Sequence, residues 1–312
     1  MILTRNPLVS IVIPMFNAQE WIVGLLTSIG NQSYQNIEII LVNDGSTDSS
    51  MELVAIFSQK NPRINLRLIN QENSGVSAAR NAGVRNSIGE LVAFVDSDDI
   101  WIREKLEHQV REMVESSTSA VACSYAIFDD SDLTILDIVH PDWSIGGVRN
   151  WLLFRSYGGL LSSSLMMTKE AFNRTGPFKV ELSLSADIEF AWRLLKVTPV
   201  KLIKKPLVGY RLRPNQMHRL PTLLLTEAQR MLVIVDLLQG NRYRRIFLAN
   251  LNLRLFLYRA QNRDLRGGTA FFLAALKNNS FEVILTMSRI LLKRVLRRLK
   301  YSEKKLFSLP NP

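Results

Sequence analysis

Hydrophobic positions in the first hundred residues gather into short, continuous runs separated by polar segments. Four of these runs have the length of buried strands: Val9–Pro14, Ile37–Val42, Ile64–Ile69 and Leu91–Val95. Three segments between them space their apolar residues as helices do: Ala18–Gln32, Ser49–Gln59 and Val76–Arg85. Strands that alternate with helices in this way predict a parallel βαβ sheet.

The pattern changes after a helix that we expect at Arg103–Ser116. More mixed strands are expected at Ala120–Phe128, Leu133–Val139, Val200–Ile203 and Leu207–Leu212, and short helices at Gly147–Phe154, Lys169–Arg174 and after Asp187. Later segments are helical by periodicity: Thr222–Leu238, Arg242–Gln261, Thr269–Lys277 and Phe281–Lys300. We therefore expect an α/β domain over residues 1–220, with halves meeting near residue 110, and a helical region over residues 221–312.

Charge distinguishes the predicted helical region from the rest of the chain. Residues 221–312 hold 17 Lys/Arg and 5 Asp/Glu, a net charge of +12, whereas residues 1–220 carry −1, and the two make up the total of +11. In the helix expected at 281–300, apolar residues share one face: Phe281, Ile284, Leu285, Leu291, Leu292, Val295 and Leu299. The opposite face carries Arg289, Lys293, Arg297 and Lys300. A basic amphipathic helix of this kind predicts binding to an anionic membrane surface.

Two other interpretations of the basic region stay open at this point. The last helix could pack on the α/β domain and leave its basic face in water. A nucleic-acid partner ranks lower, because the region lacks stacking aromatics interleaved with its basic residues, and we expect none.

The single cysteine, with no disulfide framework, favours a reducing compartment. Hydrophobic residues make up 47% of the chain, as in a globular protein, and no apolar run approaches the roughly 20 residues of a membrane span. Residues 1–14 lack a long apolar stretch before a cleavage site, so we expect no signal peptide. Cys123, which is the only cysteine, lies in an expected strand and should be a buried, inert thiol. We expect a protein bound peripherally to the inner face of the cell membrane.

Three carboxylates follow the fourth expected strand directly, at Asp96, Asp98 and Asp99. Ligands bind outside the carboxyl ends of strands in open α/β sheets, and an Asp-x-Asp pair suits a hard divalent ion that also binds phosphate. The alternative is that Asp98 or Asp99 caps the following helix. A glycine-rich dinucleotide fingerprint and a P-loop are both absent from the sequence.

Four motifs resemble family 2 glycosyltransferases with the GT-A fold, over roughly residues 8–215. They read Val-Ser-Ile-Val-Ile-Pro-x-Phe-Asn at 9–17, Val-Asn-Asp-Gly-Ser-Thr-Asp at 42–48, Asn-Ser-Gly-x-Ser-x-Ala-Arg-Asn-x-Gly at 73–83 and Phe-Val-Asp-Ser-Asp-Asp at 94–99. The resemblance implies a mostly parallel nucleotide-binding sheet with helices on both faces, to which the helical region predicted from periodicity would form a C-terminal extension. It also implies an inverting, metal-dependent transferase of cell-surface polysaccharide assembly. The expected donor is a nucleotide sugar, UDP-linked, and the expected acceptor is a hydroxyl of a saccharide or lipid-linked saccharide.

The resemblance also implies roles for single residues. Those expected at the donor are Pro14, Phe16 and Asn17 near base and ribose, Asp44 on the base, Asn73 and Arg80 in the pocket wall, and Asp96 near the ribose. Asp98, helped by Asp96, is the expected ligand of Mn²⁺ or Mg²⁺. Without the resemblance, Asp44 would be read as a turn former and Arg80 as a surface helix residue.

The acceptor side of the reaction has one candidate base. Ser185–Arg193 matches a family segment in which an Asp deprotonates the acceptor hydroxyl, so Asp187 is the expected base, with Glu189 as runner-up. Ala186 stands where many relatives carry Glu, and Asp187 could instead cap its helix.

A final basic segment, Tyr210-Arg211-Leu212-Arg213, resembles one that closes over the donor diphosphate. We expect Arg211 to bind the donor there. His218 either completes the metal site or lies on the surface.

Two other classes of protein are alternatives to a glycosyltransferase. A nucleotidyltransferase would need a phosphate-binding loop after the first strand, which Met15–Asn17 does not supply. A non-catalytic relative would bind the sugar nucleotide or act as a scaffold, but the joint presence of Asp96, Asp98 and Asp187 argues against it.

Overall fold

The computed structural model describes residues 4, 6–153, 159–183, 185–213, 227, 230–232, 235, 241–261 and 264–299. The chain divides into two compact units. Met1–Ile145 and Leu160–Arg213 belong to the first, and Gly146–Gly159 and Pro214–Ser308 to the second. The boundary expected at residue 220 lies outside the described residues.

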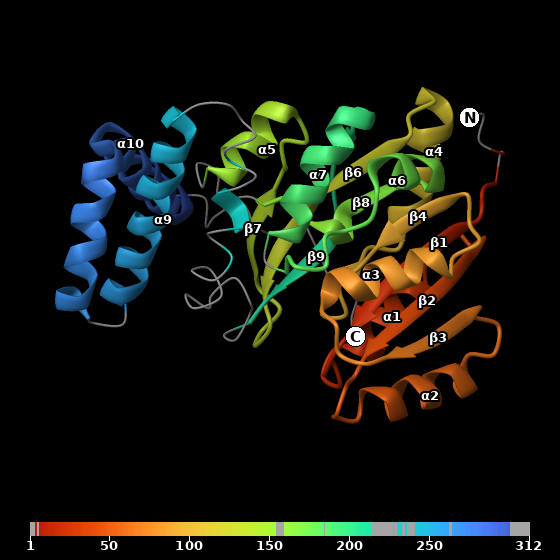
Figure 1. Cartoon of the computed structure of the whole chain (residues 1–312). Helices are drawn as coiled ribbons and strands as arrows, with labels where there is room; N and C mark the ends of the chain where they lie inside the picture. Colours follow the sequence, from red (N-terminus) through yellow and green to blue (C-terminus); the bar gives the residue numbers. More distant parts are fainter. Residues whose placement is uncertain are drawn as a thin grey trace. The chain divides into compact units, whose positions relative to one another are not determined.

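The first part of the sheet is parallel, as the alternating pattern predicts. Its strands are β1 (Val9–Met15), β2 (Ile37–Asp44), β3 (Leu66–Gln71) and β4 (Leu91–Phe94), in the order β3-β2-β1-β4 (Figure 1). The connecting helices are α1 (Ile22–Gly30), α2 (Ser50–Lys60) and α3 (Val76–Arg85). The loops that leave the four strands therefore gather at one edge of the sheet.

Beyond β4 the sheet becomes mixed. Its further strands are β5 (Ile100–Trp101), β6 (Ala120–Asp129), β7 (Ile135–Val139), β8 (Leu165–Thr168) and β9 (Lys201–Leu212). β8 lies antiparallel between β4 and β6, β9 runs parallel to β6, and β5 and β7 pair antiparallel with β9 and β6. The helices of this part are α4 (Lys105–Ser116), the 3₁₀ turn η1 (Ser162–Ser164), α6 (Lys169–Thr175) and α7 (Ala186–Val197). The expected α/β sheet with connecting helices is confirmed.

Several element boundaries differ from the expectations. The two strands expected at 200–203 and 207–212 are one strand, β9, whose register against β6 shifts near Pro206 because proline has no N–H for the ladder. β5 and β8 were not expected, since both are too short to show a period. The helix after the acidic loop begins only at Lys105 with Glu104 as its N-cap, so the capping role for Asp98 or Asp99 is wrong.

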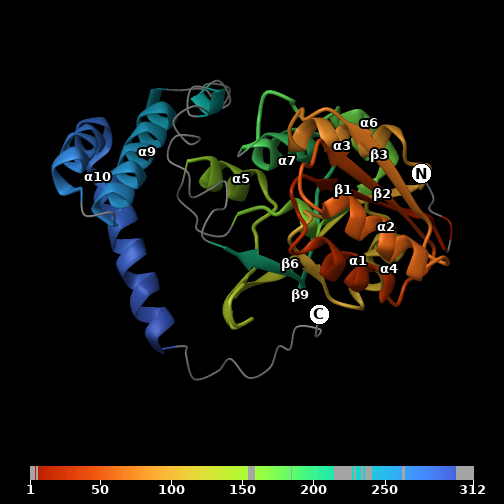
Figure 2. The same cartoon turned by 90° about the horizontal axis from the view of Figure 1, so that it is seen from below.

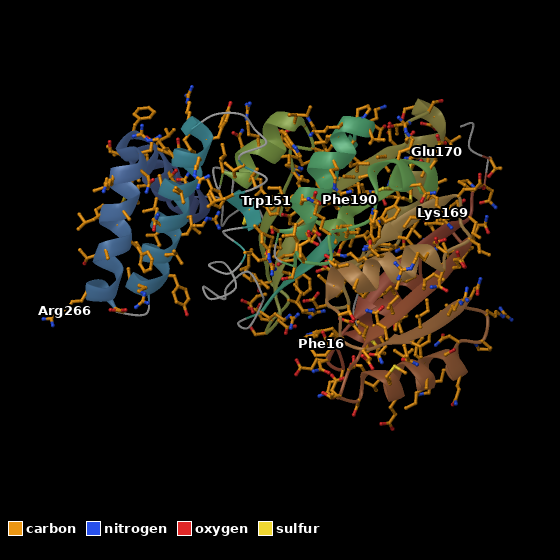
Figure 3. The ribbon with its side chains drawn as sticks, in the orientation of Figure 1. Phe16, Trp151, Lys169, Glu170, Phe190 and Arg266 are labelled. Atoms are coloured by element: carbon orange, nitrogen blue, oxygen red, sulfur yellow. The ribbon has the colours of Figure 1, made fainter. Side chains whose placement is uncertain are left out.

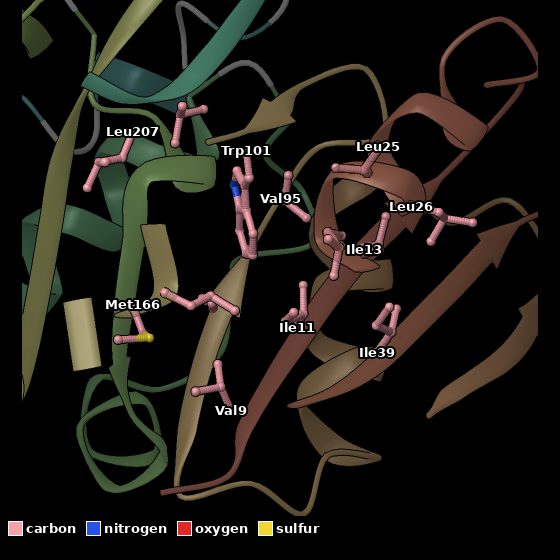
Figure 4. Packing of buried hydrophobic residues seen from close by; sticks show 14 of the residues in the cluster. Val9, Ile11, Ile13, Leu25, Leu26, Ile39, Val95, Trp101, Met166 and Leu207 are labelled. Carbon is pink, nitrogen blue, oxygen red and sulfur yellow. The ribbon is translucent and has the colours of Figure 1, made fainter. Parts of the chain in front are cut away.

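Helices cover both faces of this sheet (Figure 2). Alternate β1 residues Val9, Ile11 and Ile13 pack into the larger core with α1, α2 and α4, and Trp101 lies within the same core (Figure 4). On the opposite face, Val42 packs with α3. A strand buried on both faces explains why β1 and β2 read as continuous apolar runs.

The second unit contains α5 (Ile145–Leu152), α9 (Asn241–Gln261) and α10 (Leu265–Leu299). α10 is interrupted at Asn279, where φ is −165° and ψ is 92°, and the Asn279 Oδ1 accepts a bond from the Glu282 N–H at 3.0 Å. The two helices expected here are therefore separate segments, with the first beginning at Leu265. Most of the helix expected at Thr222–Leu238 lies outside the described residues.

In the second segment of α10, two residues of the apolar face that the sequence predicts are exposed. Phe281 is 73% exposed and Ile284 62% exposed, whereas Glu282, Val283 and Thr286 are buried. The side chains of the expected basic face, Arg289, Lys293, Arg297 and Lys300, lie outside the part that the structure describes. Of the helices that the structure describes, none has the length and apolarity needed to cross a membrane.

Candidate active site

The loops that follow β1 and β2 are tied together by Asn17. Its Oδ1 accepts a hydrogen bond from the Thr47 N–H at 2.9 Å, and its own N–H donates to the Ser46 Oγ at 3.0 Å. Asn17 has φ +48°, a conformation that asparagine tolerates better than most residues. Next to it, Phe16 is 49% exposed (Figure 3), and Pro14 is buried inside β1.

Asp44 lies at the end of β2 and organises the neighbouring loop. Its Oδ1 accepts bonds from Gln71 Nε2 at 2.7 Å and the Ser74 N–H at 2.8 Å, and its Oδ2 accepts from the Gly75 N–H at 2.9 Å. Gly75 has φ +88°, which favours glycine, and Asn73 in this turn is exposed. The role of Asp44 on a nucleotide base stays a prediction. The structure shows that its carboxylate holds the loop carrying Asn73.

The acidic loop after β4 forms a turn, in which the Asp99 N–H donates to the Asp96 carbonyl at 3.1 Å. Asp99 is buried, and its Oδ2 accepts from the Ser163 Oγ at 2.5 Å. The same Ser163 Oγ accepts from the Asp96 N–H at 3.0 Å. Burial, reinforced by the charges of Asp98 and Asp96, raises the pKa of Asp99 well above its ordinary value. Asp99 is therefore an internal support of the loop.

Arg80 projects from α3 between two carboxylates. Its Nη2 donates to Asp96 Oδ1 and its Nη1 to Asp187 Oδ1, both at 2.7 Å, and it is only 3% exposed. The guanidinium lies 5.3 Å from the ring centre of Phe178, which stacks on Phe190, labelled in Figure 3. Burial acts to lower the pKa of Arg80, but Asp187 and Asp96 outweigh it and raise that pKa. The interpretation of Arg80 as a surface residue is wrong.

Asp187 lies in the first turn of α7, and its carboxylate bonds to Arg80 of α3 and Ser162 of η1. Its Oδ1 accepts from Arg80 and from the Ser162 Oγ at 2.6 Å, and its Oδ2 receives the Ser162 N–H at 3.3 Å. Ser185 is the N-cap residue, so the capping role for Asp187 is wrong. The runner-up, Glu189, is buried and held by Arg193 at 2.7 and 2.8 Å.

The two arginines at the end of β9 differ in position. Arg211 is buried, and it donates from Nη1 to Asp130 at 2.5 Å and from Nε to the Asp98 carbonyl at 2.8 Å. Arg213 donates from Nη2 and Nε to Asp98 Oδ2, at 2.6 and 2.9 Å, and lies over the Trp21 ring at 4.1 Å. Donor binding by Arg211 stays a prediction. Arg213, which the sequence did not single out, is the arginine that pairs with the Asp98 carboxylate.

His218, the third expected metal ligand, lies outside the described residues. Within the part of the chain that the structure describes, no group of three His, Cys, Asp or Glu side chains could hold a metal by itself. Mg²⁺ commonly binds through one or two carboxylates and completes its shell with water and substrate phosphates. Asp96 and Asp98 therefore fit a divalent ion that arrives with a diphosphate.

The fold and the acidic site define a protein with the GT-A architecture of nucleotide-sugar transferases. Residues 10–176 match the family described as glycosyl transferase family 2, and the chain belongs to this family. Among curated relatives, EpsH of Bacillus subtilis is 32% identical over 218 residues, covering 67% of this chain and 62% of EpsH. The glycosyltransferase GlyG of Streptococcus pneumoniae is 35% identical over 180 residues, covering 54% and 59%. This chain thus spans about three fifths of the length of these relatives.

Solved structures of other glycosyltransferases share the fold. TarS 1–349 of S. aureus in complex with UDP-GlcNAc aligns with a TM-score of 0.58 and 18% identity, covering 86% of this chain and 91% of that one. The mannosyltransferase PcManGT from Pyrobaculum calidifontis, in complex with GDP-Man and Mn²⁺, aligns with a TM-score of 0.55 and 17% identity, covering 96% and 84%. At such identities the likeness shows the architecture alone.

Proposed function

We propose that the protein is a metal-dependent, inverting glycosyltransferase. It moves a sugar from a nucleotide-sugar donor, UDP-linked, to a hydroxyl of a saccharide or lipid-linked saccharide in cell-surface polysaccharide assembly. The observation that carries the proposal is the Arg80 bridge, because it holds the candidate metal-side carboxylate Asp96 beside the candidate base Asp187.

The donor site in this proposal lies at the loops after β1 to β4. Pro14, Phe16 and Asn17 lie where the end of β1 would meet the base and ribose, Asp44 binds the base, and Asn73 lies on the turn that Asp44 holds. The complexes of TarS with UDP-GlcNAc and of PcManGT with GDP-Man and Mn²⁺ support a nucleotide-sugar donor and a divalent ion.

The reaction needs positive charge at the diphosphate leaving group and a base at the acceptor hydroxyl. Asp98 and Asp96 would hold Mn²⁺ or Mg²⁺, which supplies a Lewis acid for the diphosphate. Arg213 and Arg211 add positive charge near the leaving group. As the acceptor oxygen bonds to the anomeric carbon, the acceptor proton passes to Asp187. The bond from that carbon to the diphosphate oxygen breaks and its electron pair leaves with the diphosphate, so the configuration inverts.

The location proposed for this reaction is the cytoplasmic face of the cell membrane, where lipid-linked acceptors present their sugars. The net charge of +12 over residues 221–312 and the exposure of Phe281 and Ile284 support peripheral binding to anionic lipid. Co-sedimentation with vesicles of anionic phospholipid, lost at high salt and reduced by Phe281→Ser, tests this part. Failure to co-sediment at low salt would contradict it.

Calorimetric titration with UDP tests the donor site directly. We expect binding that requires Mn²⁺ and is lost in Asp98→Ala but kept in the control Asp132→Ala, which removes an exposed loop carboxylate. The absence of UDP binding by the wild type under all conditions would exclude a UDP donor. UDP binding without sugar release from any UDP-sugar, by wild type and Asp187→Ala alike, would favour the non-catalytic alternative.

A further inference from the structure

Two of the three serines of η1, Ser162–Ser164, send their hydroxyls to aspartates, and the third, Ser164, donates to the Leu161 carbonyl at 2.7 Å. Ser162 Oγ donates to the candidate base Asp187 at 2.6 Å. Ser163 Oγ donates to Asp99 at 2.5 Å while accepting from the Asp96 N–H at 3.0 Å. One short turn therefore contacts both the acidic loop and the candidate base.

Buried side chains also donate hydrogen bonds to the backbone carbonyls of this turn. Trp101 Nε1 donates to the Ser163 carbonyl at 3.1 Å, and Gln109 Nε2 donates to the Ser164 carbonyl at 2.8 Å. Gln109 is fixed in turn by Lys105, whose Nζ donates to its Oε1 at 2.7 Å, and all three side chains are buried. Because both carbonyls are fixed by these hydrogen bonds, the hydroxyls of Ser162 and Ser163 can orient other side chains while the turn stays in place.

We propose that the Ser162-Ser163 pair positions both halves of the reaction centre. Ser163 shapes the acidic loop for the metal and diphosphate, and Ser162 orients the carboxylate of Asp187. Both serines are positioning residues, since they act through aspartates. The inference rests on the proposed function, because it takes Asp187 as the base and Asp96 as part of the donor site.

The contacts at Asp187 further assign its two oxygens to different tasks. Oδ1 receives two short bonds, from Ser162 Oγ at 2.6 Å and Arg80 Nη1 at 2.7 Å. Oδ2 receives only the long 3.3 Å contact from the Ser162 N–H among the bonds that the structure describes at this carboxylate. An oxygen that already accepts two strong bonds is a poorer proton acceptor, so Oδ2 receives the proton of the acceptor hydroxyl.

Alanine variants separate the two roles. Ser163→Ala should weaken Mn²⁺-dependent UDP binding at least tenfold, because Asp99 Oδ2 loses its donor and the Asp96 N–H its acceptor. Ser162→Ala should leave UDP affinity within twofold but lower kcat for UDP release from UDP-GlcNAc in water at least tenfold, without raising KM. Ser162→Thr, which keeps the hydroxyl, should restore kcat. Ser87→Ala is the control, since its buried hydroxyl donates only to the Val84 carbonyl, away from the site.

Crystal structures of the variants give a readout that does not depend on the donor. The Asp187 carboxylate should rotate in Ser162→Ala, and the 96–99 turn should shift in Ser163→Ala. Unmoved carboxylates, unchanged kcat in Ser162→Ala, or equal losses of UDP affinity in both variants would overturn the inference. A wild type that neither binds UDP nor hydrolyses UDP-GlcNAc would instead contradict the proposed UDP donor, and the carboxylate positions would still decide the roles of the serines.

Discussion

Arg80 Nη2 lies 2.7 Å from Asp96 Oδ1, and Nη1 of the same side chain lies 2.7 Å from Asp187 Oδ1. Asp187 is 107 residues away from Arg80 in the sequence, and Asp96 is 16 residues away. The planar guanidinium, with its fixed fork of donors, allows one buried cation to hold two carboxylates at once.

Replacing Arg80 should damage stability and activity by different amounts in different variants. Arg80→Met leaves two carboxylates without their buried partner, so the free energy of unfolding should fall by about 3–5 kcal/mol. Arg80→Lys keeps the charge but has no fork, so it should lose less stability while kcat still falls. Urea unfolding and turnover measure both, with Arg85→Met, exposed on the same helix, as the control. Equal stability of Arg80→Met and Arg85→Met would contradict this expectation.

Arg213 should compete with a metal for Asp98, because both cations need the same carboxylate. In Arg213→Gln, Mn²⁺ should bind about fivefold more tightly in the absence of nucleotide, since a partly buried ion pair contributes on the order of 1 kcal/mol. Calorimetry with Mn²⁺ alone measures the change. Arg103→Gln, whose guanidinium is exposed, should behave as wild type. Weaker Mn²⁺ binding by Arg213→Gln would show that Arg213 supports the metal site instead.

Gly83 allows α3, the helix of Arg80, to lie close against β1. A Cβ at this position would come within 2.3 Å of the Val12 Cγ1 atom. Gly83→Ala should therefore lower the free energy of unfolding by about 1–3 kcal/mol through overpacking. Gly24→Ala in α1 meets nothing within 4 Å and should raise it by about 0.5–1 kcal/mol. Thermal unfolding of the two variants should move in opposite directions, and movement in the same direction would refute the overpacking explanation.

Lys105 should make stability depend on pH. Burial lowers the pKa of this ammonium to about 7 in the folded protein, against an ordinary value of 10.5. Between these values the unfolded chain binds more protons, so the free energy of unfolding should rise with pH, by up to about 1.4 kcal/mol per pH unit. Burial also raises the pKa of Cys123 to about 11, which acts in the opposite direction at higher pH.

The measurement is therefore urea unfolding between pH 7 and 9. Lys105→Met removes the titrating group and should flatten the rise across this window, whereas Lys60→Met at the end of α2, where the lysine is exposed, should keep it. An unchanged slope in Lys105→Met would show that other groups cause it.

Much of the fold could be predicted from local patterns. β1 and β2 are continuously apolar because both faces of each strand are covered. Helix periodicity predicted α1, α2 and α3, with differences only at helix ends. β5 and β8 could not be predicted, since strands of two and four residues carry no period and exist only because β9, β4 and β6 lie beside them. The exposure of Phe281 and the burial of Glu282 likewise depend on neighbours, because α9 offers Asn250 as a partner for Glu282.

The sequence by itself determined the family, the sheet that carries the loops, and the carboxylates Asp96, Asp98 and Asp187 as candidates, because motif order and strand periodicity are local properties. The tertiary structure alone decided which groups meet. It placed Arg80 between two aspartates and Arg213 rather than Arg211 on the Asp98 carboxylate. It also brought Ser162 of η1 to Asp187 and Ser163 to Asp99. Such contacts join residues far apart in the chain, and a side chain's partner depends on the packing of strands and helices, which no local pattern records.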